Sequence, residues 1–309
     1  MKDTKGYYVQ RLENRVIDLL DREDFQPLFD TIKDDKDLLF EVRKGFPIVY
    51  YLGCKIIGIR PYYKKQLSLS IDSKYATLNR RRDGNEKQNY DEEAKKLLDE
   101  MNKNRFDYTF WKENLKNVKR IIGRYRDNVA PNEERKKQQR IAKANNDFDG
   151  EVIIFDTEYG VRKEPVTSSK LCKIDMTGVC KNDRGKYDIT VIELKVGDGA
   201  VEGTAGVGEH IKDFGIILNS RKDDLKQSIL NIFEIKKRYG IFEHCPEELV
   251  LSGEYRAVVL AYDLDKMKKP YKEKYIDKNI ETEGYKLTAA AACDDRDKLT
   301  KEFLFGDKK

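Results

Sequence analysis

Residues 170–196, KLCKIDMTGVCKNDRGKYDITVIELKV, decide how the second half of this chain is expected to fold. Two mostly apolar runs, KLCKIDMTGVC and KYDITVIELKV, flank the turn sequence NDRG, in which Gly185 can adopt a positive φ angle. The stretch therefore predicts a β-hairpin. Because side chains alternate along a strand, Glu193 and Lys195 should project from the same face. Asp175 lies across the hairpin in the partner strand, where it can approach both of them.

These three charged residues stand in strands that are otherwise apolar, and a buried charge is costly unless it is paired or bound to a metal. Two carboxylates and water are ordinary ligands of Mg²⁺. A lysine ammonium beside them can orient a water molecule or offset negative charge on a phosphate. Asp175, Glu193 and Lys195 thus form a set sufficient for phosphodiester hydrolysis. The alternative is a salt-bridged cluster at the end of a strand.

The sequence on either side of the hairpin predicts an α/β core. A charged helix, NEERKKQQRIAKANN, ends near Asn146 and leads into the strand EVIIFDTEYGV. After the hairpin come a Gly-rich stretch, a helical region over residues 209–239 with breaks expected at Gly215 and Asn219, and the strand YRAVVLAYDL. The order is helix, three strands, helix and strand. The AAAA run in the C-terminal tail receives no assignment.

The N-terminal part predicts an α+β module. Residues 8–33 carry apolar side chains at helical spacing, interrupted by a proline. Four short β-branched or aromatic runs, separated by turn signals, predict an antiparallel strand meander over residues 37–76. Residues 90–128 are again helical. Trp111 in this region is expected in the core rather than on the surface as a base-stacking platform.

The sequence VAPN, residues 129–132, separates the two parts. Pro131 ends the preceding helix, and Asn132 can cap the next one. We therefore predict two domains. The first, residues 1–130, is an N-terminal α+β module that binds substrate or a partner, and the second, residues 131–309, carries the α/β core.

Composition indicates a folded protein of the cytoplasm. Of the 309 residues, 38% are charged and 10% are aromatic, and the formal net charge is +5. The five cysteines include no CxxC pair and there are two histidines, which argues against a zinc site and suits a reducing compartment. Neither a signal-peptide core nor a membrane-spanning stretch is expected. Four basic clusters could meet phosphates or form solvated faces: residues 80–82, 112–126, 135–140 and 266–274.

An Asp followed by Glu-x-Lys, on a hairpin preceded by a helix and a strand, resembles the PD-(D/E)XK nuclease superfamily, which includes many restriction enzymes and DNA-repair nucleases. The resemblance covers residues 132–263, and Ile174 stands where the motif has its proline. It implies a restriction-endonuclease-like core, in which a central mixed sheet is flanked by helices. It also implies that Asp175 and Glu193 bind Mg²⁺, with Mn²⁺ as a substitute, and that Lys195 takes part in catalysis.

Further side chains would flank this site in the resembling fold. Glu158 in the first strand would be a third metal ligand, and Glu134 in the preceding helix is the alternative. His210 and Lys212, in the helix after the hairpin, would contact phosphate or water. The Gly-rich stretch 197–208 lacks the GK[ST] of a nucleotide P-loop, so it is either a mobile loop or a gate for substrate. Three other carboxylates rank lower as ligands: Asp156, Asp188 and Asp198.

The sequence therefore predicts a Mg²⁺-dependent endonuclease or exonuclease that prefers DNA and serves restriction, defence or repair. The partner is nucleic acid rather than a membrane, and a homodimer is compatible with the prediction. Three alternatives stay open. They are a non-catalytic nucleic-acid-binding protein on the same fold, an interaction protein whose charged triplet is a salt-bridge cluster, and an RNase.

Overall fold

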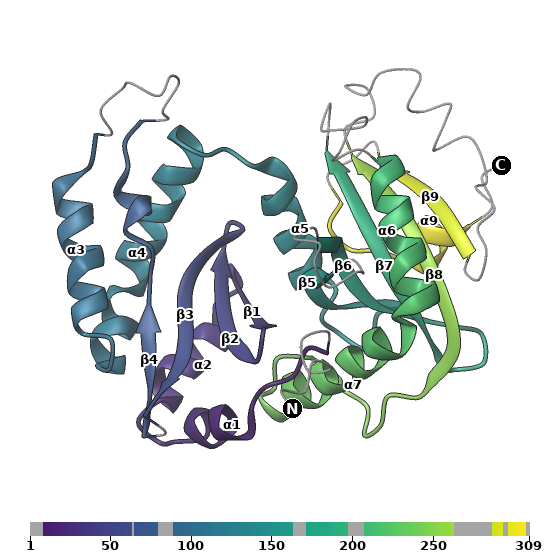
Figure 1. Ribbon diagram of the computed structural model, residues 1–309, viewed down its shortest axis with the longest axis horizontal. Helices are drawn as coiled ribbons and strands as arrows, with labels where there is room; N and C mark the ends of the chain where they lie inside the picture. The colour runs from purple at the N-terminus through teal and green to yellow at the C-terminus, as the bar shows by residue number, and fades with distance from the viewer. Residues whose placement is uncertain are drawn as a thin grey trace. The chain divides into compact units, whose positions relative to one another are not determined.

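Figure 1 shows the computed structural model of the chain, which describes residues 9–63, 65–79, 89–162, 171–196, 207–262, 286–292 and 296–306. The chain divides into two compact units. The first unit is Arg11–Gln139, and the second contains Arg140–Lys309 together with Met1–Gln10. One unit has a four-stranded antiparallel sheet and the other a five-stranded mixed sheet, which confirms the predicted α/β class at this level.

The sheet of the first unit is the predicted meander. Its strands follow one another in the order β1-β2-β3-β4, and every neighbouring pair is antiparallel. Alternate residues of β4 are buried, as the apolar–polar alternation of QLSLS predicts. The strands are β1 (Leu38–Arg43), β2 (Phe46–Tyr51), β3 (Cys54–Tyr62) and β4 (Gln66–Ser70).

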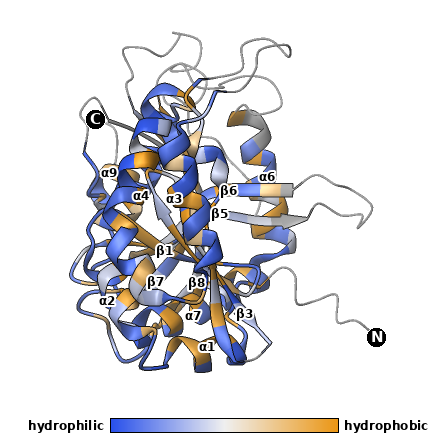
Figure 2. Ribbon diagram, turned by 90° about the vertical axis from the view of Figure 1, so that its left-hand side faces the viewer, coloured by the Kyte–Doolittle hydropathy of each residue, from blue (hydrophilic) through white to orange (hydrophobic). Residues whose placement is uncertain are grey.

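Helices α1 (Asn14–Leu20), α2 (Gln26–Asp34), α3 (Glu92–Lys103) and α4 (Tyr108–Asn128) complete the first unit, with a 3₁₀ turn at Ser73–Ala76. Orange apolar and blue polar residues alternate around these helices in Figure 2, because each helix buries one face. Trp111 is completely buried, and its Nε1 donates to the carbonyl of Asn104 at 3.1 Å. Its prediction as a core residue is confirmed.

Part of the basic cluster 112–126 serves the fold of this unit. Arg126 is buried and donates to three backbone carbonyls. Lys119 lies 2.9 Å from a carboxylate oxygen of Asp35 and 2.7 Å from one of Asp37. The fold of the first unit therefore uses both cations, because Arg126 binds backbone carbonyls and Lys119 pairs with two aspartates.

Helix α5 (Glu133–Ala144) begins after Asn132, whose Oδ1 accepts a backbone N–H of the first turn at 2.9 Å. The predicted N-cap is confirmed. The division between the units falls inside this helix, after Gln139, rather than at the VAPN break. The reason is that the Gln139 side chain accepts the N–H of Gly53 at 2.7 Å and donates to the carbonyl of Asp37 at 2.6 Å, which ties the start of α5 to the meander.

The second unit is built on a mixed sheet of order β5-β6-β7-β8-β9. The first three strands are antiparallel neighbours, whereas β7–β8 and β8–β9 are parallel pairs. Gly185 in the β6–β7 turn has a φ of 73°, as the hairpin prediction requires. The strands are β5 (Val152–Arg162), β6 (Leu171–Lys181), β7 (Tyr187–Val196), β8 (Leu251–Tyr262) and β9 (Lys286–Ala292).

One local prediction for this unit is corrected, and one unassigned run is placed. Gly215 and Asn219 both lie within α6 (Val207–Ser220), and the break before α7 (Lys222–Arg238) falls at Arg221. A glycine costs a helix only about 1 kcal/mol, which the packing of the buried neighbours offsets. The unassigned AAAA run belongs to β9, because pairing with β8 supplies the order that alanine's weak strand preference does not.

An aromatic cluster lies at the centre of the second unit's apolar core. The ring of Phe148 meets those of Phe155, Phe233 and Phe242 nearly edge-on, with centroid distances of 6.1, 5.7 and 5.4 Å. A short helix, α9 (Lys301–Phe305), lies near the C-terminus. Among the described residues, none of the helices has the length and apolar character that crossing a bilayer requires.

Candidate active site

The β6–β7 hairpin carries the candidate site at the point where its ladder stops. The last regular pair is Met176–Ile192, so one further step along both strands places Asp175 opposite Glu193. Beyond that pair, the backbone N–H of Leu194 donates to Oδ2 of Asp175 at 2.9 Å. The Asp175 carboxylate therefore lies against the backbone at the centre of the Glu-x-Lys motif.

Glu193 and Lys195 form a buried ion pair. Nζ of Lys195 lies 2.6 Å from Oε1 of Glu193, and the two side chains are only 5% and 1% exposed. The contact requires both side chains on one face, as the two-residue spacing predicts. Nε2 of His210 in α6 lies 3.1 Å from the same glutamate oxygen. One carboxylate oxygen thus receives a lysine and a histidine together.

Helix α6 contributes a second buried polar group that the sequence reasoning did not select. Asp213 stands one turn after His210, is almost completely buried, and accepts the backbone N–H of Lys173 at 3.3 Å. The helix therefore contacts β7 through His210 and β6 through Asp213. An acidic residue three positions after His210 on the same apolar helix face was the available signal. Lys212 has an exposed side chain and does not share that face.

The predicted third ligand, Glu158, stands across the β5–β6 ladder from Asp175, because Thr157 pairs with Met176 and Tyr159 with Ile174. Its role as a ligand stays a prediction. Glu158 is half-buried in β5 with a φ of 57°. Within the described part of the chain, one group of three potential ligands has its ligand atoms all within 4.8 Å of one another: Asp147, Glu243 and His244. That group does not include Asp175, Glu193 or Glu158.

The remaining predicted residues belong to other elements or lie outside the described residues. Glu134 belongs to α5 in the first unit. Asp156 is buried in β5. Asp198 and most of the Gly-rich stretch 197–208 lie outside the described residues. The roles given to Glu134 and to this stretch therefore stay predictions.

Asp188 is a structural carboxylate. Ser252 Oγ and Asn182 Nδ2 donate to its Oδ1 at 2.7 and 2.8 Å, and Arg256 contacts its Oδ2 through two nitrogens, both at 2.7 Å. Burial alone would raise the pKa of Asp188, but these hydrogen bonds and the charge of Arg256 lower it overall. With its oxygens held by protein donors, Asp188 braces the start of β7 against β8.

No family model, no curated protein and no solved structure matches this chain. The case for its function therefore rests on the chemistry of the residues at the hairpin.

The donor set of the site suits a hard divalent cation. Asp175 and Glu193 offer carboxylate oxygens, which Mg²⁺ prefers, and Mg²⁺ needs few protein ligands because it keeps several waters. The hydrogen bonds described above use Oδ2 of Asp175 and Oε1 of Glu193, so coordination through Oδ1 and Oε2 would leave them in place. Lys195 supplies the positive charge that a carboxylate pair lacks.

Proposed function

We propose that the chain is a Mg²⁺-dependent nuclease with its active site at the open end of the β6–β7 hairpin. The observation that carries the proposal is the buried Glu193–Lys195 pair, at 2.6 Å, beside an Asp175 carboxylate anchored on the intervening backbone N–H. A salt-bridge cluster would also pair these charges, and the Mg²⁺ titration described below separates the two readings. The mixed sheet with its antiparallel β5–β6–β7 and parallel β8 also agrees with the core that the resemblance implies.

Each residue has a distinct task in the proposed reaction. Asp175 and Glu193 would hold the metal, which when bound lowers the pKa of a coordinated water and polarises the phosphate. Lys195 orients the attacking water and offsets the negative charge that builds on phosphorus-bound oxygens. His210 fixes the Glu193 carboxylate from α6, and the Leu194 N–H fixes that of Asp175. DNA is the preferred substrate, and the biological role is restriction, defence or repair.

The direct test is cleavage by the full-length protein. Linear, circular and single-stranded DNA, together with RNA, are incubated with Mg²⁺, with Mn²⁺ or with EDTA. We expect products with either metal and none with EDTA. Comparing linear with circular DNA separates end-dependent from internal cutting, and the RNA arm tests the RNase alternative. Absence of metal-dependent products from every substrate would overturn the proposal.

Metal binding can be tested without any substrate. A ligand that binds only the folded state raises the free energy of unfolding by about 2.7 kcal/mol at a concentration about 100 times its Kd. We therefore expect Mg²⁺ to raise the melting temperature of the wild type and not that of Asp175→Asn. A non-catalytic nucleic-acid-binding protein would show no Mg²⁺ stabilisation in either.

The matched control for this titration is Asp183→Asn, the same substitution at an exposed carboxylate in the turn of the same hairpin. Its melting temperature should respond to Mg²⁺ as that of the wild type does. If Asp175→Asn retained the full response, Asp175 would not be a metal ligand.

A further inference from the structure

The β3–β4 hairpin of the first unit ends in the sequence RPYYKK, residues 60–65, and presents an aromatic ring to solvent. The side chain of Tyr63 is 79% exposed. Its φ angle is 45°, in the left-handed region that Gly, Asn and Asp adopt most readily and that a bulky residue rarely occupies. A smaller polar residue would suit this turn better, so the fold alone does not explain the tyrosine.

Tyr63 is the outer member of a group of three rings, Tyr62, Tyr63 and Phe106, which we call the aromatic ridge. The centroids of Tyr62 and Tyr63 are 4.4 Å apart, and those of Tyr62 and Phe106 are 4.9 Å apart. The guanidinium carbon of Arg105 lies 5.0 Å from the Tyr62 centroid and 4.8 Å from that of Phe106. The ridge therefore combines ring faces with a cation held against them.

Positive charge surrounds the aromatic ridge. Arg60 is two residues before Tyr62 on the same strand, so both project from one face of β3. Four cations near the ridge have exposed side chains: Arg60, Lys65, Lys103 and Arg105. The nearby Asp24 is paired with Arg22 at 2.9 Å, and Asp107 accepts the Phe110 N–H as the N-cap of α4. The four exposed cations therefore outnumber these two carboxylates, one of which already has Arg22 as its partner.

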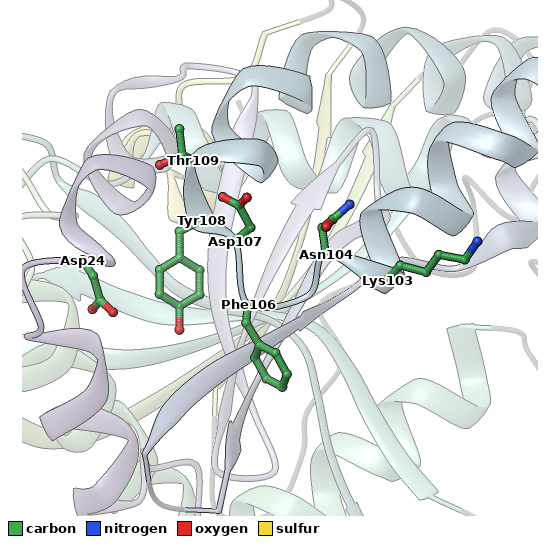
Figure 3. A pocket seen from close by; sticks show the side chains of 7 residues that line it. All are labelled: Asp24, Lys103, Asn104, Phe106, Asp107, Tyr108 and Thr109. Atoms are coloured by element: carbon green, nitrogen blue, oxygen red, sulfur yellow. The ribbon is translucent and has the colours of Figure 1, made fainter.

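An open pocket of about 550 Å³ adjoins the aromatic ridge, because Phe106 belongs to both. Figure 3 shows the aromatic side chains of Phe106 and Tyr108 together with the polar side chains of Asn104 and Thr109 around it. Its charged lining residues are Lys103, Asp24 and Asp107. An amide and a hydroxyl can hydrogen-bond the edge of a nucleobase, and the two rings supply apolar wall.

We propose that the aromatic ridge and this pocket bind single-stranded nucleic acid. Unpaired bases stack on Tyr63 and reach the pocket beside Phe106, while the exposed lysines and arginines meet the phosphates. Aromatic rings set among cations are the chemistry that recognises an unstacked strand, and a duplex keeps its base faces hidden. All of these residues belong to the first unit, so the inference does not depend on the proposed nuclease centre.

The test is equilibrium binding of fluorescent oligothymidylate and oligouridylate to the full-length protein, by anisotropy in EDTA. EDTA prevents metal-dependent cleavage, so failure of the nuclease proposal leaves this result readable. Tyr63→Asn should weaken binding by about tenfold, the loss of one stacked base. Tyr63→Phe should bind as the wild type does. The melting temperature of Tyr63→Asn should equal or exceed that of the wild type, because Asn accepts the left-handed conformation.

The matched control is Tyr90→Asn, at another exposed tyrosine of the first unit whose ring also faces a lysine, with Lys95 Nζ 5.3 Å from its centroid. Its binding should be unchanged. The two oligonucleotides distinguish DNA from RNA as the preferred strand. Wild-type affinity in Tyr63→Asn would overturn the proposal. Equal affinity of the wild type for single strands, duplex DNA and polyphosphate would overturn it too, because binding would then rest on charge attraction alone.

Discussion

Replacing Lys195 by Met is expected to reduce metal-dependent cleavage by about 10²–10³-fold, the usual cost of losing one preorganised charge-stabilising group. Met keeps the length and apolar stem of the side chain and removes only the ammonium. Because Lys195 lies 2.6 Å from Glu193, the same change leaves a buried carboxylate without its lysine. Cleavage is measured as initial rates on the best substrate, with melting temperature recorded beside it.

The control is Lys237→Met, because Lys237 pairs with Glu247 away from the Glu-x-Lys motif. Its rate should match that of the wild type. Cleavage by Lys195→Met at the wild-type rate would point to a contaminating nuclease and remove the lysine from the mechanism.

A double variant, Glu193→Gln with Lys195→Met, separates catalysis from stability. Replacing both members of a buried pair is often neutral, whereas removing one costs about 3–5 kcal/mol. The double variant should therefore recover much of the stability that Lys195→Met loses. If the pair is catalytic, the double variant should remain inactive. If the pair is only a salt bridge, the double variant should regain its function together with its stability.

The second large effect is expected at the start of β7. Arg256→Met should lower the free energy of unfolding by about 3 kcal/mol, the lower end of the cost of unpairing a buried charge. The lower end applies because Arg256 is 22% exposed, whereas Asp188 is 2% exposed. Chemical denaturation provides the measurement. Arg184→Met, an exposed arginine in the β6–β7 turn, should change the value by less than about 0.5 kcal/mol.

The effect of Arg256→Met should depend on pH in one direction. The pKa of Asp188 is lowered in the folded protein, so its pairing contributes stability above the ordinary aspartate pKa of about 3.9. That contribution is lost as the pH falls below this value toward the lowered pKa. The difference between wild type and variant should therefore be full near neutral pH and shrink below about pH 4. A difference that grew on acidification would contradict the assignment.

Local patterns predicted much of the fold. Apolar–polar alternation predicted the meander, and NDRG predicted the turn at Gly185 because its chemistry is contained in a few residues. The strand β9 was not predicted, since its alanines carry no strand signal and its order comes from pairing with β8. The boundary between the two units inside α5 was not predicted either, because it depends on hydrogen bonds between Gln139 and residues far away in the sequence.

Local spacing predicted part of the candidate site as well. The spacing of Glu193 and Lys195 places both on one face of a strand, and their ion pair follows from it. The sequence did not show that Asp213 belongs to the site. Its place there comes from a hydrogen bond with the backbone of Lys173, where α6 packs on β6. Glu158 was selected by resemblance alone. It adopts a left-handed backbone conformation within β5, which the sequence pattern did not predict.

The carboxylate of Asp175 is anchored on a main-chain amide, which every residue type except proline supplies. The hydrogen bond itself therefore places no demand on the side chain at position 194, and packing constrains the completely buried Leu194 instead. Lengthening residue 175 by one methylene, by contrast, would carry its oxygens past the amide. The hairpin thus constrains position 194 through its apolar packing and position 175 through the reach of its carboxylate, on facing strands.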